Sequence, residues 1–152
     1  MRIAVVCLGN ICRSPMADVV LEQRLSDAGI DAEVVSAGTA GYHVGGPMDR
    51  RAAATLREAG YDPSRHRAKQ VDATWFESCD LVLAMDQDNH ADLLRIAGDH
   101  HPKLRMFRSF DPAGPGDVPD PYYGGDDGFR EVLEMVERTA DAIVDELQRV
   151  AG

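Results

Sequence analysis

The sequence of 152 residues lacks long hydrophobic runs. No apolar stretch approaches the roughly 20 residues that a membrane-spanning helix needs, and we therefore expect no membrane contact. An early apolar run ends at Gly9 and Asn10, which makes it too short for the core of a secretion signal. A cytoplasmic protein is the default expectation, with export by a route without a signal as the alternative.

Cysteine and positive charge are also scarce. The chain has three cysteines, an odd and sparse set that favours a reducing compartment over a disulfide framework. Lysine and arginine total 16 against 26 for aspartate and glutamate, which gives a formal net charge of −10. Such a surface repels polyanions, so we do not expect nucleic-acid binding as a general function. An anionic substrate would have to be held by a local positive site.

The N-terminal part of the chain contains a strand, a tight loop and the start of a helix. Residues 3–6 form an apolar run that predicts a strand. A helix is predicted beyond residue 15, because apolar residues recur there at helical spacing. These residues are Ala17, Val20, Leu21, Leu25 and Ala28. The connecting segment 7–15 has the sequence CLGNICRSP.

This connecting loop combines an anion-binding backbone with a nucleophile. Backbone N–H groups of a loop that curls into a helix N-terminus point at one spot, where the helix dipole adds positive potential. Arg13 can add a bidentate fork to two oxygens of a tetrahedral oxyanion. Cys7, at the end of the strand, would lie beneath that anion. We expect the same donors and the Ser14 hydroxyl to favour a Cys7 thiolate that can attack at neutral pH.

Other residues are expected to shape the loop. Gly9 supplies a backbone angle that a side chain would forbid, the Asn10 amide ties the loop in place, and Pro15 suits a first helical turn. An isolated cysteine after a core strand is more often a buried, inert thiol. The spacing of Cys7, Arg13 and Ser14 between a strand and a helix favours the nucleophile instead.

The rest of the chain alternates strands and helices. Strands are predicted at residues 33–36, 81–85 and 104–107, and helices at 49–59, around Trp75 and Phe76, at 87–97 and at 129–150. The pattern predicts one α/β domain over residues 1–152, with a four-stranded parallel sheet and helices on both faces. Ligands of such sheets bind beyond the carboxyl ends of the strands, where the Cys7 loop would emerge.

Two connecting segments have unusual compositions. Residues 61–71 form a basic patch in an acidic protein, and a solvated loop paired with nearby carboxylates is its simplest interpretation. Residues 108–128 are rich in proline and glycine, which predicts a long loop that is stiff in places. Loops of that length in compact domains are usually functional or disordered.

Residues 6–17, VCLGNICRSPMA, resemble the signature loop of the low-molecular-weight protein tyrosine phosphatases. Later segments resemble that family's motifs in its order: SAGT at 36–39, DPSRHRA at 62–68, AMD at 84–86 and VPDPYYG at 118–124. The resemblance covers essentially the whole chain. It implies a flavodoxin-like strand order of 2-1-3-4 and a metal-independent phosphotyrosine hydrolase without a cofactor. The substrate-binding residues that it implies in the loop are Leu8, Gly9, Asn10, Ile11, Cys12 and Ser14.

Asp120 is the candidate general acid. A thiolate that attacks phosphorus expels an alkoxide or phenoxide, and that oxygen needs a proton. Pro119 and Pro121 restrict the backbone at Asp120, and partial desolvation by its neighbours would favour the protonated carboxyl. From spacing alone, a turn aspartate that bonds its own backbone is an equal alternative. The match of residues 120–123 to the family's general-acid motif favours the catalytic role.

The resulting hypothesis has two steps through a phosphocysteine. Cys7 attacks in line while Asp120 protonates the leaving oxygen, and Asp120 then takes a proton from the hydrolytic water. Arg13 and the loop N–H groups stabilise the equatorial oxygens in both steps. We expect tyrosine-phosphorylated proteins as substrates, inorganic phosphate and similar oxyanions as inhibitors, and a monomeric enzyme. The histidines are scattered, and Cys7 with Cys12 alone does not make a zinc site.

Aromatic walls are expected to determine substrate choice. Tyr42 and Tyr122, with Tyr123 beside them, are candidates because aromatic faces form a slot that holds phosphotyrosine at attacking depth. Family members often carry Trp where Tyr42 stands, and ordinary surface tyrosines are the alternative. Relatives that hydrolyse phosphoarginine carry Thr at the position of Ile11, so an apolar residue there favours phosphotyrosine.

Two rival functions and one regulatory property remain to be weighed. Arsenate reduction uses a similar loop in related proteins, but it needs a relay of further thiols, for which only Cys79 is available. A non-catalytic phosphopeptide-binding module would keep Arg13 but has no use for Cys7 together with Asp120. The resemblance also implies a reversible Cys7–Cys12 disulfide that spares the nucleophile from overoxidation.

Overall fold

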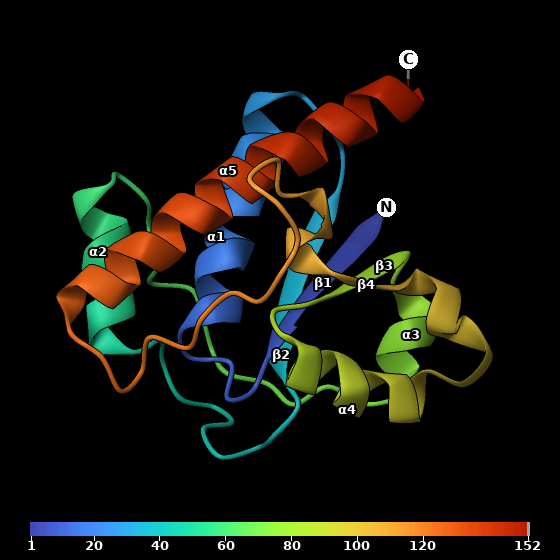
Figure 1. The fold of residues 1–152 in the computed structure, drawn as a ribbon, viewed down its shortest axis with the longest axis horizontal. Coiled ribbons are helices and arrows are strands. Elements are labelled where there is room, and N and C mark those ends of the chain that lie inside the picture. The colour runs from blue at the N-terminus through green and yellow to red at the C-terminus, as the bar shows by residue number, and fades with distance from the viewer. Residues whose placement is uncertain (152) are drawn as a thin grey trace.

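Four parallel strands form the centre of the fold (Figure 1). A computed structural model describes residues 1–151 of the protein, with side chains up to residue 150. The strands are β1 (Arg2–Cys7), β2 (Glu33–Gly38), β3 (Leu81–Ala84) and β4 (Leu104–Met106), in the order β2-β1-β3-β4. Every neighbouring pair is parallel, which confirms the predicted sheet and its 2-1-3-4 order.

Helices cover both faces of this sheet, as the alternation of strands and helices predicts. They are α1 (Arg13–Asp27), α2 (Arg50–Glu58), α3 (Thr74–Ser78), α4 (Gln87–Ala97) and α5 (Asp126–Ala151), with the 3₁₀ helices η1 (Gly98–Lys103) and η2 (Phe107–Phe110). Helices α1, α2 and α5 pack on one face, and α3 and α4 pack on the other (Figure 1). Within residues 1–151, no helix is long and apolar enough to cross a membrane.

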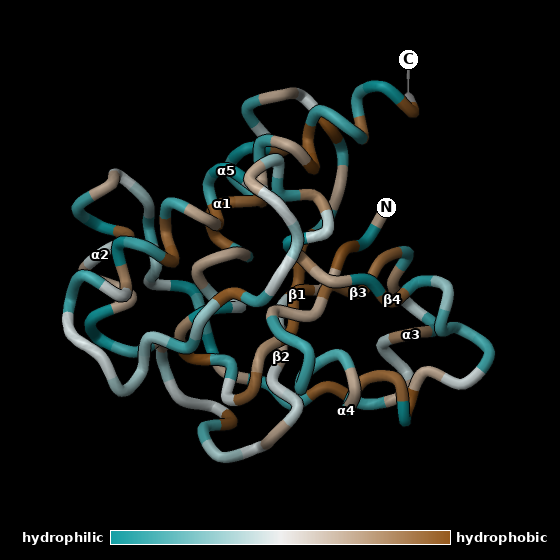
Figure 2. Tube along the Cα trace, viewed as in Figure 1, coloured by the Kyte–Doolittle hydropathy of each residue, from teal (hydrophilic) through white to brown (hydrophobic). Residues whose placement is uncertain are grey.

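Strand β1 divides the core into two apolar clusters. Ile3 and Val5 pack with residues of α1, α2 and α5, whereas Ala4 and Val6 pack with residues of α3 and α4. A central strand covered on both sides has no polar face, which explains its unbroken apolar run. Figure 2 shows β1 as hydrophobic, while hydrophobic and hydrophilic residues alternate along α5.

The carboxyl ends of β1, β2 and β3 meet at one edge of the sheet. Cys7 pairs in register with Gly38 of β2, and Val6 pairs with Ala84 of β3. A Cβ atom on Gly38 would lie 2.6 Å from the Leu8 carbonyl oxygen, so only glycine allows the loop after β1 to pass so close to β2. The loops that follow β1 and β3 therefore leave the sheet side by side, where such folds bind ligands.

Several element boundaries differ from the sequence-based ones. Helix α5 begins at Asp126 rather than at residue 129, because the acidic side chains of its first turn interact favourably with the helix dipole. Strands β3 and β4 end one residue earlier than predicted, at Ala84 and Met106. The 3₁₀ helices η1 and η2 were not predicted, because such short turns carry no apolar periodicity.

Candidate active site

The predicted nucleophile Cys7 is the last residue of β1 and precedes the loop that leads into α1. The residue is buried, with 3% of its surface exposed. Its Sγ lies 3.0 Å from the Oγ of Ser14, which belongs to the first turn of α1. The strand, loop and helix expected around Cys7 are therefore present, and the Ser14 hydroxyl reaches the sulfur.

Asn10 holds the loop in shape from behind. It is fully buried and has φ of 58°, the only positive φ of a non-glycine residue within residues 1–151. Its Nδ2 donates to the Oγ of Ser14 at 2.8 Å and to the Oγ of Ser36 at 3.1 Å, and its Oδ1 accepts from the Lys69 backbone N–H at 2.9 Å. Because Ser14 accepts this bond, its own hydrogen can be donated either to the Cys7 sulfur at 3.0 Å or to the Ala37 carbonyl oxygen at 3.4 Å. Donation to the sulfur stabilises a thiolate.

Arg13 opens α1, and its side chain is almost completely buried. Its Nη1 donates to the Asp86 Oδ2 at 2.6 Å and to the Val118 carbonyl at 3.1 Å. Burial disfavours the charged guanidinium, but the Cys7 sulfur and the Asp86 carboxylate outweigh it and raise the pKa of Arg13 above its ordinary value. The guanidinium is therefore a permanent positive charge beside the sulfur.

The Asp120 carboxyl faces the same guanidinium. Its Oδ2 lies 3.7 Å from the Nη2 of Arg13, while its Oδ1 accepts a hydrogen bond from the Tyr122 backbone N–H at 3.1 Å. One oxygen thus closes a turn, as the turn interpretation predicts, and the other faces Arg13. The catalytic role of Asp120 stays a prediction. The side chain is 39% exposed, which leaves it open to substrate.

A cavity of about 230 Å³ opens at Cys7. Its lining residues are Cys7, Leu8, Gly9, Ile11, Cys12, Arg13, Tyr42, His43, Asp120, Tyr122 and Tyr123. Pockets for larger ligands span about 300–1,000 Å³, so this one suits a group of the size of an aryl phosphate. Asn10 and Ser14 are not among these lining residues, and their side chains hydrogen-bond each other within the loop. Their predicted contact with substrate stays a prediction. Within residues 1–150, no group of three His, Cys, Asp or Glu side chains is placed to hold a metal ion.

Comparison with known proteins agrees with this geometry. A family model described as low molecular weight phosphotyrosine protein phosphatase matches residues 2–151. The chain belongs to this family. A low molecular weight protein-tyrosine-phosphatase of Streptomyces coelicolor is 47% identical over 150 residues, covering 94% of this chain and 91% of that protein.

Solved structures of phosphatases have the same fold as this family member. A protein tyrosine phosphatase from Entamoeba histolytica, with Hepes in its active site, matches with a TM-score of 0.95 and 31% identity, covering 100% of this chain and 99% of that one. A mutant of the YwlE arginine phosphatase with a phosphorylated active-site serine matches with a TM-score of 0.91 and 27% identity, covering 97% and 96% of the two chains. The chain is thus a phosphatase of the protein-tyrosine-phosphatase class.

The three tyrosines predicted as walls all line the pocket of this low-molecular-weight phosphatase. Tyr122 and Tyr123 meet edge to face, with ring centroids 5.0 Å apart. The Arg51 guanidinium lies 5.4 Å from the Tyr122 ring centroid. Tyr42 and Tyr123 are 78% and 92% exposed, so their rings are available to a ligand.

The cysteines of this phosphatase occupy two different environments. Cys7 and Cys12 lie in the core cluster under α1, and Cys79 lies in the cluster on the opposite face of the sheet. Burial, followed by the negative charge of Asp49, raises the pKa of Cys12 far above its ordinary value, and burial also raises the pKa of Cys79. All three cysteines are free thiols. The Cys7–Cys12 disulfide stays a prediction.

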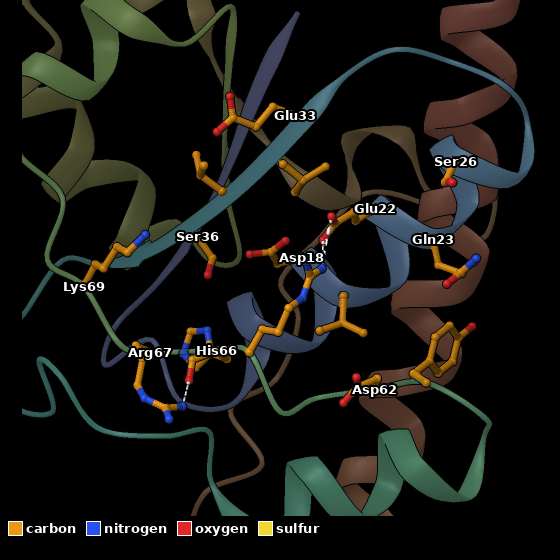
Figure 3. Close-up of a pocket in the computed structure, with 15 residues that line it drawn as sticks. Asp18, Glu22, Gln23, Ser26, Glu33, Ser36, Asp62, His66, Arg67 and Lys69 are labelled. Carbon is orange, nitrogen blue, oxygen red and sulfur yellow. Dashed lines mark hydrogen bonds and ion pairs between the residues drawn. The ribbon is translucent and has the colours of Figure 1, made fainter.

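A second, larger cavity of about 750 Å³ lies between α1, β2 and the basic segment 61–69. Figure 3 shows the Asp18 carboxyl at its centre, between Ser36 and Glu22. His66 Nε2 lies 2.7 Å from the Asn10 carbonyl oxygen, and burial lowers the pKa of this histidine. Arg65 pairs with Glu22 at 3.2 Å, so the interpretation of the basic segment as a loop paired with carboxylates holds for this arginine.

Two residues of the site escaped the sequence-based assignment. Asp86 lies two residues after the end of β3, caps α4 through a bond from the Asn89 backbone N–H, and fixes the Arg13 guanidinium. An aspartate directly after the strand predicted at residues 81–85 was the available signal. His43 lines the pocket beside Gly9, and nothing in its glycine-rich surroundings distinguished it from an ordinary loop histidine.

Proposed function

We propose that the protein hydrolyses phosphotyrosine in proteins without a metal ion and through a phosphocysteine intermediate. One observation carries the proposal: the Cys7 sulfur, the Arg13 guanidinium and the Asp120 carboxyl line one small pocket at the carboxyl edge of the sheet. A nucleophile, an oxyanion-binding group and a proton donor are the three parts that phosphoryl transfer to a thiolate requires.

The first step transfers the phosphoryl group to sulfur. The Cys7 Sγ forms a bond to phosphorus in line with the scissile P–O bond, and that bond breaks as Asp120 gives its proton to the tyrosyl oxygen. Arg13 and the N–H groups of loop 8–13 stabilise the equatorial oxygens, whose charge is greatest at the transition state. The Ser14 hydroxyl, 3.0 Å from the sulfur, stabilises Cys7 as an anion before attack and as a leaving group afterwards.

The second step returns the enzyme to its starting state. Asp120, now a carboxylate, takes a proton from a water molecule whose oxygen attacks phosphorus. The P–S bond breaks, the Cys7 thiolate is regenerated, and inorganic phosphate leaves. Phosphate and similar oxyanions fit the same cradle, so we expect them to inhibit competitively.

The decisive experiment measures hydrolysis of aryl phosphates in the presence of a chelator. Cys7→Ser should lose nearly all activity. Asp120→Ala should lose about 10²- to 10⁴-fold in kcat/KM for phenyl phosphate, and much less for a nitrophenyl phosphate whose leaving oxygen needs no proton. A Cys7→Ser enzyme that keeps its activity contradicts the proposal, and an equal loss for both esters in Asp120→Ala removes this residue as the acid.

Other functions receive less support. Arsenate reduction needs a thiol relay, but Cys79 is buried across the sheet from Cys7, so thioredoxin oxidation driven by arsenate should be absent. A phosphopeptide-binding module would not need Asp120 in the pocket. Ile11 presents an apolar side chain to the pocket, which supports phosphotyrosine over phosphoarginine. We further propose that the enzyme works as a monomer in the cytoplasm.

A further inference from the structure

The carboxyl of Asp120 is held only loosely by its own contacts. Those found among residues 1–150 are the hydrogen bond from the Tyr122 backbone and the 3.7 Å approach to Arg13. The residue lies in an irregular segment between η2 and α5, and its side chain is well exposed. A general acid must nevertheless stay within reach of the leaving oxygen. Its position must therefore come from the chain on either side.

Upstream of Asp120, one arginine holds the backbone. Arg108 donates through Nη1 to the Asp117 carbonyl at 2.8 Å and through Nη2 to the Gly114 carbonyl at 3.2 Å. Its Nε donates to Asp111 at 2.8 Å, and the fully buried Asp111 carboxylate also accepts two bonds from Arg138 of α5, at 2.7 and 2.9 Å. The hydrogen bonds from Arg138 are the main reason that the pKa of Asp111 lies well below its ordinary range.

Val118, which follows Asp117 in the chain, connects this segment to the active site. The Val118 backbone N–H donates to the Met85 carbonyl at 2.7 Å, and the Val118 carbonyl accepts from Arg13 at 3.1 Å. The Asp117 carboxylate accepts from the Gln87 backbone N–H at 3.0 Å. Within three residues before Asp120, the chain is thus attached to the residue after β3, to the start of α4 and to the Arg13 guanidinium.

Downstream of Asp120, a second arginine repeats the arrangement. Arg51 donates to the Tyr122 carbonyl at 2.8 Å and to the Gly124 carbonyl at 3.3 Å. The same guanidinium contacts Asp49, the N-cap of α2, at 3.2 Å. The Asp49 backbone N–H in turn donates to the Ile11 carbonyl of the phosphate-binding loop at 2.9 Å. This contact ties the acid segment to the loop that would hold the phosphoryl group.

We propose that Arg108 and Arg51 are positioning residues, two clamps that hold residues 119–121 so that Asp120 stays over the Cys7 sulfur. Each guanidinium joins two backbone carbonyls to a carboxylate that is itself held in place. For Arg108 this carboxylate is Asp111, which Arg138 of α5 holds, and for Arg51 it is Asp49, whose backbone bonds the loop after β1. Lysine cannot replace either residue, because an ammonium lacks the planar set of donors that reaches three acceptors in fixed directions. The inference rests on the proposed function, because a clamp on Asp120 matters only where Asp120 is the acid.

The test compares Arg108→Gln and Arg51→Gln with Arg95→Gln, an exposed control on α4 that pairs with Asp92. Each variant is assayed with phenyl phosphate and with nitrophenyl phosphate, and the inhibition constant of inorganic phosphate is measured. A displacement of about 1 Å costs on the order of 10²-fold when geometry limits a reaction. We therefore expect kcat/KM for phenyl phosphate to fall about tenfold or more in both clamp variants. For Arg108→Gln, kcat/KM for nitrophenyl phosphate and the inhibition constant of inorganic phosphate should each change by less than about twofold. The Arg95→Gln control should match the wild type in all three quantities.

A double-mutant cycle separates positioning from general damage to the fold. In the Asp120→Ala background the Arg108→Gln change should have almost no further effect, because the group that it positions is gone. Arg108→Lys keeps a positive charge beside Asp111 and serves as the variant with the smaller effect on folding, and it should still lose phenyl phosphate activity. Equal losses of kcat/KM for both esters, or additive losses in the double-mutant cycle, would contradict the positioning role of the two arginines. Failure of the proposed function is distinct, since it would appear as activity of Cys7→Ser in the otherwise unchanged enzyme.

Discussion

Three groups able to carry negative charge surround one buried guanidinium at Arg13. The Cys7 sulfur, the Asp86 carboxylate and the Asp120 carboxyl all act on it, and each contributes to the raised pKa of this arginine. A buried arginine with a single partner would leave its remaining donors unsatisfied. Here Asp86 takes one donor permanently, which leaves the face toward Cys7 and Asp120 for an oxyanion. Asp86 thus contributes to the anion site by orienting Arg13, although its own negative charge would repel an anion.

Asp18 lies outside the active site, and its carboxyl group should make the stability of the protein depend on pH. Burial raises the pKa of Asp18 from 3.8 to about 7. The folded state therefore binds a proton more tightly than the unfolded state, and the free energy of unfolding must fall as pH rises between these two values. Asp18→Asn removes this loss, so we expect it to stabilise the protein on the order of 2 kcal/mol near pH 8 and hardly at all near pH 4.

Thermal unfolding at several pH values measures this effect. The exposed Asp31→Asn is the matched control and should leave the difference between acidic and neutral pH unchanged. An increase in Tm of a similar size at both pH values would show that Asp18 is not buried as a charged group, and that Asn stabilises the site for another reason.

At the scale of elements, parallel strands and two long helices bring the site together. β1 and β3 end side by side, so Cys7 and Asp86 come from neighbouring strand ends although they are far apart in the chain. Helix α5 packs against α1 and carries Arg138, which anchors the Asp111 carboxylate. The irregular segment before α5 is therefore held by arginine side chains, among them Arg138 of α5 through Asp111, rather than by regular secondary structure of its own.

Truncation of a buried residue on α5 tests how far this packing supports stability. Ile143 is 1% exposed and lies in the core cluster with residues of α1, whereas Ile96 on α4 is 37% exposed. Ile143→Ala should lower the free energy of unfolding by about 2–5 kcal/mol, through lost burial and the cavity left behind. The same change at Ile96 should cost less than about 1 kcal/mol. Urea denaturation measures both, and equal losses would show that the packing of α5 against α1 contributes no more to stability than the exposed face of α4.

At the scale of the whole molecule, a local positive site lies in a strongly negative protein. We expect the net charge of −10 to repel phosphorylated ligands at long range, and Arg13 with the loop N–H groups to attract them at contact. These two effects act over different distances. Salt screens exposed charges beyond about 10 Å and affects buried contacts much less.

Ionic strength should therefore separate the two effects. For an acidic phosphotyrosine peptide, kcat/KM should rise as monovalent salt increases from about 20 to 200 mM, because the long-range repulsion is screened. For a peptide with basic residues around the phosphotyrosine, kcat/KM should fall over the same range. Parallel slopes for the two peptides would show that the overall charge of the protein does not influence substrate encounter.

The parts that could be predicted from the sequence are those encoded by contiguous residues. The segment 7–15 carries the nucleophile, the guanidinium and the helix start within one loop, and apolar runs marked the strands well enough to give the sheet. The 3₁₀ helices and the first turn of α5 were missed, because they lack periodicity or begin with charged residues. Asp120 could be proposed as the general acid only with the aid of the family motif, since an aspartate between prolines also fits an ordinary turn.

The sequence by itself determined a parallel α/β sheet and the cysteine loop at its edge, because strand propensity, helix periodicity and loop chemistry are local. Only the tertiary structure decided which groups complete the site. Arg13 meets Asp86 across 73 positions of the chain and the Val118 carbonyl across 105, and Arg138 meets Asp111 across 27. Such contacts depend on where helices and strand ends come together in space, and no local pattern of residues encodes that.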